Sequence, residues 1–288
     1  MIFRTDLAVE PREGLRTRKK GLEQTEETHG SCKITRIRVN GEEGKQIGKE
    51  PGTYVTVEVP PITDYIDMTD ERVELLSKEI AALLPREGLV LVAGLGNREV
   101  TPDALGPDTT RHIKGELARV TGLTGLRPVA VVSPGVLGST GMETSEFLQA
   151  VAHGFSPSVI VAVDALASRS LARLGCTVQL SDAGISPGEG VGNARPRIGR
   201  DTLGIPVVSV GVPTVVDAET LAFDLFGGDS EKTERSKSKV TPRGAQMVVT
   251  PREVDLLVGR AAKMTAMALN RALNPSLSVE DLMMLTAG

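Results

Sequence analysis

The stretch that decides the fold of this chain is Leu89-Val-Leu-Val-Ala-Gly-Leu-Gly-Asn-Arg-Glu-Val-Thr-Pro-Asp103-Ala-Leu-Gly-Pro107. Its unbroken apolar run predicts a strand buried on both faces, and the glycines that follow allow a tight turn before a helix near Pro107. Asp103 therefore lies just beyond a strand end. Because the crevice of an open α/β sheet lies outside the carboxyl ends of its strands, this carboxylate is a candidate site residue.

Strand and helix patterns alternate on both sides of this stretch. Apolar runs predict further strands at 128–132, 158–163, 176–180 and 206–210. Helices are expected from Thr69, at 107–120, 142–152 and 165–174, and from Thr250, which is the expected N-cap of the last one. Alternating β-branched residues at 33–39 and 53–59 predict an antiparallel hairpin. The expected fold class is α/β, a three-layer α/β/α arrangement with a mostly parallel central sheet and a small antiparallel β insertion near the N-terminus.

Composition excludes several classes of function. The chain has 288 residues, of which 40% are hydrophobic, so it can bury a large core. A net charge of −4 gives no electrostatic reason to bind nucleic acid or a membrane, and 2% aromatic residues argue against a base-stacking surface. Two cysteines match no metal or redox spacing, and neither a signal peptide nor a long apolar span is present, so a soluble cytoplasmic protein is expected. Residues 1–30 are expected to form a solvated arm.

Two carboxylates are the strongest candidates for chemistry. Asp164 directly follows the apolar run at 158–163, and Asp103 comes after the run at 89–94. Both are therefore expected at one end of the sheet. Two carboxylates in a low-dielectric crevice cannot both ionise easily, so one stays protonated as an acid while the other activates water. Two other interpretations remain open. Each aspartate caps the following helix, or the pair holds a divalent metal with help from Asp217 or a histidine.

Other motifs are incomplete. Gly94-x-Gly96 begins a dinucleotide fingerprint, but Glu99 fills its third glycine position. The chain has no H-E-x-x-H pair and no G-x-S-x-G elbow. The glycine-rich stretch 181–193 is expected either to shape the crevice wall or to form a simple turn. The residues expected to line the crevice wall are Gly94, Gly96, Asn97, Asp182, Gly188, Gly190, Gly192 and Asp217.

Four long motifs, in order along the chain, resemble those of the germination protease family of spore-forming bacteria. They are Asn97-x-x-Val-Thr-Pro-Asp-Ala-Leu-Gly-Pro107, Val163-Asp-Ala-Leu-Ala-Ser168, Ser181-Asp-x-Gly-Ile-x-Pro-Gly-x-Gly-Val-Gly-Asn193 and Gly204-Ile-Pro-Val-Val-x-Val-Gly-Val-Pro-Thr-Val-Val-Asp217. The resemblance implies an endopeptidase that degrades small acid-soluble spore proteins in the spore core during germination, made as a homotetrameric zymogen. It also implies that Asp103 and Asp164 are the catalytic aspartates and that no metal or other cofactor is needed.

A processing site is implied as well. Arg4-Thr-Asp-Leu-Ala-Val-Glu10 resembles the self-cleavage sequence of the family, which is an acid, an apolar residue, Ala, any residue and Glu. The bond cut would join Asp6 to Leu7, and substrates of the family are cut at the same pattern. The expected organisation is a prosegment at 1–6, a peptidase domain at 7–274 and a C-terminal extension at 275–288. Within the domain, a hairpin insertion is expected at about 30–60 and a mobile charged loop at about 227–245.

The core is also similar to the hydrogenase-maturation peptidases. In that family a G-x-G-N loop, an acid six residues after the Asn and a V-D-A strand end bind nickel together with a histidine. The two acidic positions correspond to Asp103 and Asp164. The alternatives to an aspartic-type peptidase are therefore a metal-dependent peptidase or maturation protein, and a non-catalytic binding module for spore proteins.

Overall fold

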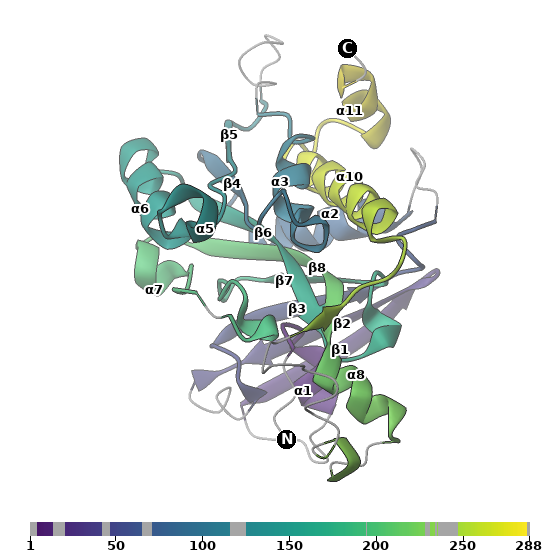
Figure 1. Ribbon diagram of the computed structural model, residues 1–288. Coiled ribbons are helices and arrows are strands. Elements are labelled where there is room, and N and C mark those ends of the chain that lie inside the picture. Colours follow the sequence, from purple (N-terminus) through teal and green to yellow (C-terminus); the bar gives the residue numbers. More distant parts are fainter. Residues whose placement is uncertain are drawn as a thin grey trace.

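A single large sheet forms the centre of the computed structural model, which describes residues 5–13, 21–41, 47–64, 71–115, 125–193, 195–227, 231–233, 235 and 247–286. The strand order is β1-β2-β3-β7-β8-β6-β4-β5, and β9 pairs with β8 (Figure 1). The strands that run parallel are β5 (Val129–Val132), β4 (Val90–Gly94), β6 (Val159–Ser168) and β8 (Val207–Asp217). The antiparallel pairings involve β1 (Leu22–His29), β2 (Cys32–Val39), β3 (Gly52–Glu58), β7 (Thr177–Ser181) and β9 (Val248–Val249).

The sheet is mixed, so the prediction of a mostly parallel sheet is wrong. The predicted hairpin is confirmed as β2 and β3, but β3 also pairs with β7, which joins the hairpin to the central sheet. A parallel connection needs a crossover of a dozen or more residues. The link between β6 and β7, at 169–176, holds only the short helix η3 (Leu171–Arg173), so β7 returns antiparallel.

Helices cover both faces of the parallel part of the sheet. One face packs against α2 (Glu71–Leu83), α3 (Leu105–Thr110) and α10 (Val254–Leu273), and the other against α6 (Thr144–Phe155) and α7 (Arg200–Leu203) (Figure 1). In β4, Val92 faces the first group and Leu91 the second, as expected for a strand buried on both sides. The C-terminal helix α11 (Val279–Thr286) buries Val279 against the first core and so docks on the fold.

The N-terminal region corrects the prediction of a solvated arm. Leu7 and Ala8 are 0% exposed and, with Val9 at the start of α1 (Val9–Glu13), pack under the antiparallel part of the sheet. Residues 22–29 form β1, whose outer side chains are polar because it is an edge strand. The segment that carries the expected cleavage bond is therefore part of the core.

Some helix predictions are wrong because strand pairing or a tertiary contact outweighs the helix propensity of the local sequence. A helix at 165–174 is wrong, because β6 continues to Ser168 and pairs with β8 beyond Asp164. The helix predicted at 107–120 ends at Thr110, although residues 116–120 lie outside the described part of the chain. The helix expected from Thr250 begins at Val254 without a side-chain cap, because the Thr250 hydroxyl donates to the Thr214 carbonyl instead.

Most of the charged stretch at 227–245 lies outside the described residues. No helix in the described part of the chain is long and apolar enough to cross a membrane.

Candidate active site

A cleft of about 460 Å³ opens at the carboxyl ends of the parallel strands. Asp103 and Asp164 both line it, as the sequence predicts, and Asp6 lines it as well. Its other walls come from the loops after β4 and β5, from β8 and from the glycine-rich stretch after β7. The cleft therefore brings together three carboxylates that are far apart in the chain.

Asp103 is held by the loop that follows β4. It ends the short helix η2 (Thr101–Asp103), and its Oδ2 accepts a hydrogen bond from the Asn97 N–H at 2.7 Å. Gly96 has φ +110°, and a Cβ there would lie 2.1 Å from the Asp103 carbonyl oxygen. Burial raises the pKa of Asp103, and the bond from Asn97 partly offsets this. The loop therefore fixes the position of Asp103 and keeps the Asn97 N–H bonded to its carboxylate.

Asp164 lies inside β6, opposite Gly211 of β8, rather than at a strand end. It is only 5% exposed, and its Oδ1 accepts a bond from the Ala165 N–H at 2.9 Å. Burial raises its pKa well above the usual range, and the charges of Asp103 and Asp6 raise it further. Of the two predicted aspartates, Asp164 is the one whose surroundings most favour the protonated form.

Asp6 is bound to the edge of the site by its side chain and its backbone. Its N–H donates to the Ala167 carbonyl at 2.9 Å, and the Ala167 N–H donates back to its carboxylate at 2.7 Å. The second carboxylate oxygen accepts from the Gly190 N–H at 3.0 Å. A Cβ at Gly190 would lie 2.2 Å from this carboxylate, so only glycine permits the contact. Burial raises the pKa of Asp6, whereas Lys49 and the two N–H groups lower it.

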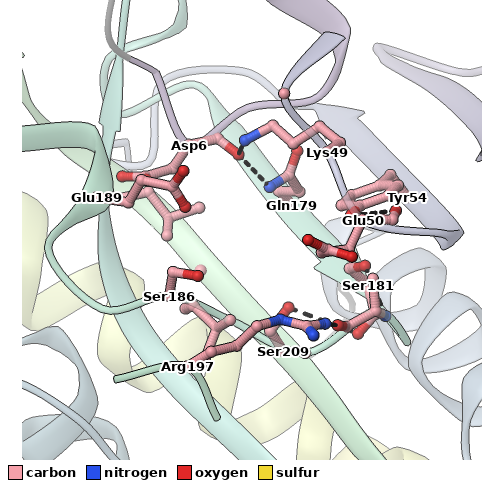
Figure 2. Close-up of a pocket in the computed structure, with 16 residues that line it drawn as sticks. Asp6, Lys49, Glu50, Tyr54, Gln179, Ser181, Ser186, Glu189, Arg197 and Ser209 are labelled. Atoms are coloured by element: carbon pink, nitrogen blue, oxygen red, sulfur yellow. Dashed lines mark hydrogen bonds between the residues drawn. The ribbon is translucent and has the colours of Figure 1, made fainter. Parts of the chain in front are cut away.

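The carbonyl oxygen of Asp6 has two side-chain donors. Lys49 Nζ lies 2.9 Å from it and Gln179 Nε2 lies 2.8 Å from it (Figure 2). Lys49 Nζ also contacts the Thr5 carbonyl oxygen at 3.3 Å, and Gln179 Oε1 accepts from the Ala8 N–H at 2.6 Å. These groups face a second, smaller cavity of about 110 Å³, which Asp6 and Leu166 share with the larger cleft.

Glu10 anchors the other end of the same segment. Its carboxylate accepts from the N–H groups of Arg169 and Ser170 at 2.7 and 2.8 Å, and the Arg173 guanidinium lies 3.6 Å away. Both acids of the Asp-Leu-Ala-Val-Glu pattern are therefore held by backbone donors just after Asp164 in the chain, with a basic side chain near each.

The remaining predicted site residues divide into two groups. Gly96, Asn97 and Gly188 line the cleft, and Gly190 contacts Asp6. The others lie outside the cleft lining: Gly94 packs against Gly106, Asp182 accepts from the Thr53 N–H, Gly192 caps η4 (Glu189–Val191), and Asp217 caps α8 (Ala218–Leu225). Leu7, which follows Asp6 at the expected cleavage bond, has its side chain buried in the core.

Lys49 and Gln179 are the functional candidates that sequence reasoning missed. Neither belongs to a recognisable motif, and both reach Asp6 only through the folding of distant strands. No signal in the sequence singles them out.

The donor set does not fit the nickel site that the likeness to hydrogenase-maturation peptidases implies. That site needs a histidine beside the two acids, and no histidine is among the described residues that line the cleft. Within the described ranges, no group of three or more His, Cys, Asp and Glu side chains is arranged to hold a metal ion.

Comparisons with known proteins agree with the four sequence motifs. A family profile described as germination protease matches residues 4–227. The germination protease of Clostridium tetani is 39% identical, with 98% of each chain covered. That of Caldanaerobacter subterraneus subsp. tengcongensis is 40% identical, with 97% of each chain covered.

A solved [NiFe] hydrogenase maturation protease, HycI from Thermococcus kodakarensis, is more distant. It is 16% identical, with 68% of this chain and 98% of its own chain covered, and its TM-score is 0.40. The sequence relatives decide the assignment, because they match nearly from end to end. This chain belongs to the germination protease family, which is a family of peptidases.

Proposed function

We propose that this protein is an aspartic-type endopeptidase that begins the degradation of small acid-soluble spore proteins in the spore core, and that it is made as a zymogen cutting its own Asp6–Leu7 bond. The observation that carries the proposal is that Asp6 lines the same cleft as Asp103 and Asp164. An acid followed by an apolar residue is thus held beside two carboxylates whose pKa values are both raised.

The two aspartates have different roles in this proposal. Asp164 is the more deeply buried and faces the charges of Asp103 and Asp6, so it holds the proton. Asp103 keeps the bond from the Asn97 N–H, which favours its ionised form, so it acts as the base. Two carboxyl groups whose surroundings separate their pKa values supply an acid and a base at the same pH.

Hydrolysis of the Asp6–Leu7 bond then proceeds through attack by water and cleavage of the C–N bond. Asp103 removes a proton from a water molecule, whose oxygen bonds to the carbonyl carbon of Asp6. The C–N bond to Leu7 breaks as Asp164 gives its proton to the Leu7 nitrogen. The products are a carboxyl group on Asp6 and an amino group on Leu7, and transfer of the proton from Asp103 to Asp164 restores the starting state.

Recognition of protein substrates follows the same contacts. Small acid-soluble spore proteins that carry an acid, an apolar residue, Ala, any residue and Glu would occupy the positions that Asp6 to Glu10 occupy here. The N–H groups of Ala167 and Gly190 would bind the first acid, and those of Arg169 and Ser170 the second. Residues 1–6 must leave, and residues 7–10 must undock, before another chain can occupy these positions.

Variants of each aspartate test the proposal. Asp103→Asn and Asp164→Asn should each abolish cleavage of a purified small acid-soluble spore protein and self-processing, while circular dichroism stays that of the wild type. Asp255→Asn, which changes an exposed aspartate on α10, is the matched control and should keep full activity. Wild-type turnover by Asp103→Asn would contradict the assigned base.

Two measurements separate the alternatives. Loss of cleavage after exhaustive chelation, with recovery on adding a divalent metal, would favour a metal-dependent peptidase instead. Intact spore protein after prolonged incubation with the wild type, together with stable binding, would favour a non-catalytic module. The proposal predicts defined fragments in both experiments, with or without a chelator.

We also propose, from the family resemblance, that the protein is a homotetramer. Sedimentation analysis of the purified full chain tests this directly. A monomer at micromolar concentration would contradict it.

A further inference from the structure

We propose that Lys49 and Gln179 form an oxyanion-binding pair, which holds the carbonyl oxygen of the bond to be cut and stabilises the negative charge that develops there. This inference rests on the proposed cleavage of the Asp6–Leu7 bond and goes beyond it. Lys49 and Gln179 are then two further catalytic groups, and they contact the reacting carbonyl from outside the cleft that Asp103 and Asp164 line.

The geometry at the carbonyl oxygen is the first argument. Lys49 Nζ and Gln179 Nε2 lie 2.9 and 2.8 Å from the Asp6 carbonyl oxygen, and Figure 2 shows both bonds converging on it. The donors of an oxyanion hole lie about 2.7–3.1 Å from the position that the developing oxyanion takes, and two donors already bound to the carbonyl oxygen are close enough to reach that position. This carbonyl belongs to the bond between an acid and an apolar residue that the family pattern marks for cleavage.

The amide of Gln179 has a fixed orientation. Its Oε1 lies 2.6 Å from the Ala8 nitrogen, and a backbone N–H can only donate. The amide oxygen must therefore face Ala8, which leaves the NH₂ group facing the Asp6 carbonyl. Gln179 also lies in the middle of β7, paired with Thr56 and Gly211, so its backbone is held on both sides. A donor fixed in this way needs little reorganisation during the reaction.

Lys49 supplies a positive charge at the same oxygen. Its Nζ bridges the carbonyl oxygens of Thr5 and Asp6, on consecutive residues. Burial lowers its pKa, while the carboxylates of Asp6, Glu189 and Glu10 favour its charged form. A cation in a partly dry site stabilises a developing oxyanion far more than one in water does.

The arrangement of the two cavities explains why the pair and the aspartates act on one bond. Asp103 and Asp164 line the larger cleft but not the smaller cavity, whereas Lys49 and Gln179 line the smaller cavity but not the cleft. Asp6 lines both. Water that attacks from the cleft therefore drives electron density onto an oxygen already bound by Lys49 and Gln179.

This arrangement divides the chemistry among four side chains. As the water oxygen bonds to the Asp6 carbonyl carbon, the C=O electron pair moves to the carbonyl oxygen. Lys49 and Gln179 stabilise the negative charge on that oxygen through their hydrogen bonds, without transferring a proton. Asp164 does not have to protonate the carbonyl oxygen and keeps its proton for the Leu7 nitrogen. The C=O bond re-forms when the C–N bond breaks.

The test measures the first-order rate of self-processing in the full chain, by mass spectrometry of the new N-terminus at Leu7. Lys49→Met and Gln179→Met should each slow this rate by about 10²–10³-fold, the loss typical of one oxyanion-hole donor. Lys49→Arg keeps a cationic donor and should recover part of the rate. The matched control, Lys78→Met, changes an exposed lysine on α2 and should process at the wild-type rate.

A second readout separates catalysis from docking. Hydrogen exchange of the Leu7–Glu10 amides in Lys49→Met should match that of an Asp103→Asn chain, in which the segment stays docked and uncut. Slow processing with unchanged protection supports the inference. Slow processing together with lost protection would overturn it, because the residues would then only hold the segment in place.

Two outcomes distinguish this inference from the proposed function. Wild-type rates in both methionine variants, with Asp103→Asn inactive, would overturn the oxyanion pair and leave the aspartate proposal standing. A wild-type chain that never cuts at Leu7 would overturn both.

Discussion

At the scale of single residues, Asp164 carries a cost in stability. Its pKa is raised in the fold, so between the usual value of 3.8 and the raised value the folded chain binds more protons than the unfolded chain. The free energy of unfolding therefore falls as pH rises through that window. Such a cost is common where a site needs a buried acid.

Asp164→Asn removes this cost. Compared with the wild type, the variant should gain free energy of unfolding as pH is raised from about 4 to about 7, because Asn has no charge to bury. Urea denaturation at several pH values measures the difference. A constant difference between the two proteins across this range would show that the Asp164 carboxyl titrates normally.

Glu10 offers a second prediction at this scale. Glu10→Gln replaces one acceptor oxygen with an NH₂ group that faces an N–H donor of Arg169 or Ser170. The variant should lose about 1–3 kcal/mol of stability, the cost of a buried donor without a partner, and should process more slowly. Denaturant titration checks the first effect, with Glu87→Gln as an exposed control. Equal stability of the two variants would count against a bound Glu10 carboxylate.

The sequence predicts some site residues and misses others for a physical reason. Asp103 and Asp164 are marked by apolar runs that end near them, and Asp6 by a local pattern. In the sequence, Lys49 lies among polar residues and Gln179 between the apolar residues of a strand, and no motif marks either. Only the pairing of β3 with β7 and the docking of the N-terminal segment bring them together. A contact among three segments that are far apart in the chain produces no local sequence pattern.

At the scale of elements, the loop between β4 and α3 depends on Gly96. Gly96→Ala would force a side chain into φ +110° and against the Asp103 carbonyl. The strain should cost about 1–3 kcal/mol. Displacing Asp103 by about 1 Å should also slow self-processing by about 10²-fold.

A matched substitution in a helix separates the loop effect from the general effect of replacing glycine. Gly154 lies in α6 with open space where a Cβ would be, so Gly154→Ala should stabilise the chain by about 0.5–1 kcal/mol and leave processing unchanged. Thermal unfolding and the processing rate of both variants check the comparison. Full activity in Gly96→Ala would mean that the loop does not position Asp103.

The elements that the sequence predicts wrongly are those that strand pairing decides. Residues 165–168 are as compatible with a helix as with a strand, and their pairing with β8 selects the strand. Residues 22–29 are mostly polar because most of their side chains are exposed in the edge strand β1, so their composition resembles that of a solvated arm. In contrast, the sequence predicts β4 and α2 correctly, because the continuous apolar run of β4 and the apolar stripe of α2 at Val73, Leu76 and Ile80 are local signals.

At the scale of the whole molecule, the mixed sheet explains how the site is built. The parallel strands bring Asp103 and Asp164 to one edge, as open α/β sheets do. The antiparallel strands add the floor on which residues 5–10 dock, with Gln179 of β7 and Tyr54 of β3 beneath them. The two proposed catalytic aspartates are therefore held by the parallel part of the sheet, and the segment with the proposed cleavage bond packs on the antiparallel part and on β6.

The measurement that tests the central claim most directly is self-processing of the purified full chain in heavy-oxygen water. If a water molecule activated by the aspartate pair attacks the Asp6 carbonyl, the released Met1–Asp6 peptide carries one heavy oxygen atom and the remaining chain begins at Leu7. Asp103→Asn releases no peptide. An unlabelled peptide from the first turnover would show that a protein carboxylate, rather than water, is the nucleophile, and would contradict this account.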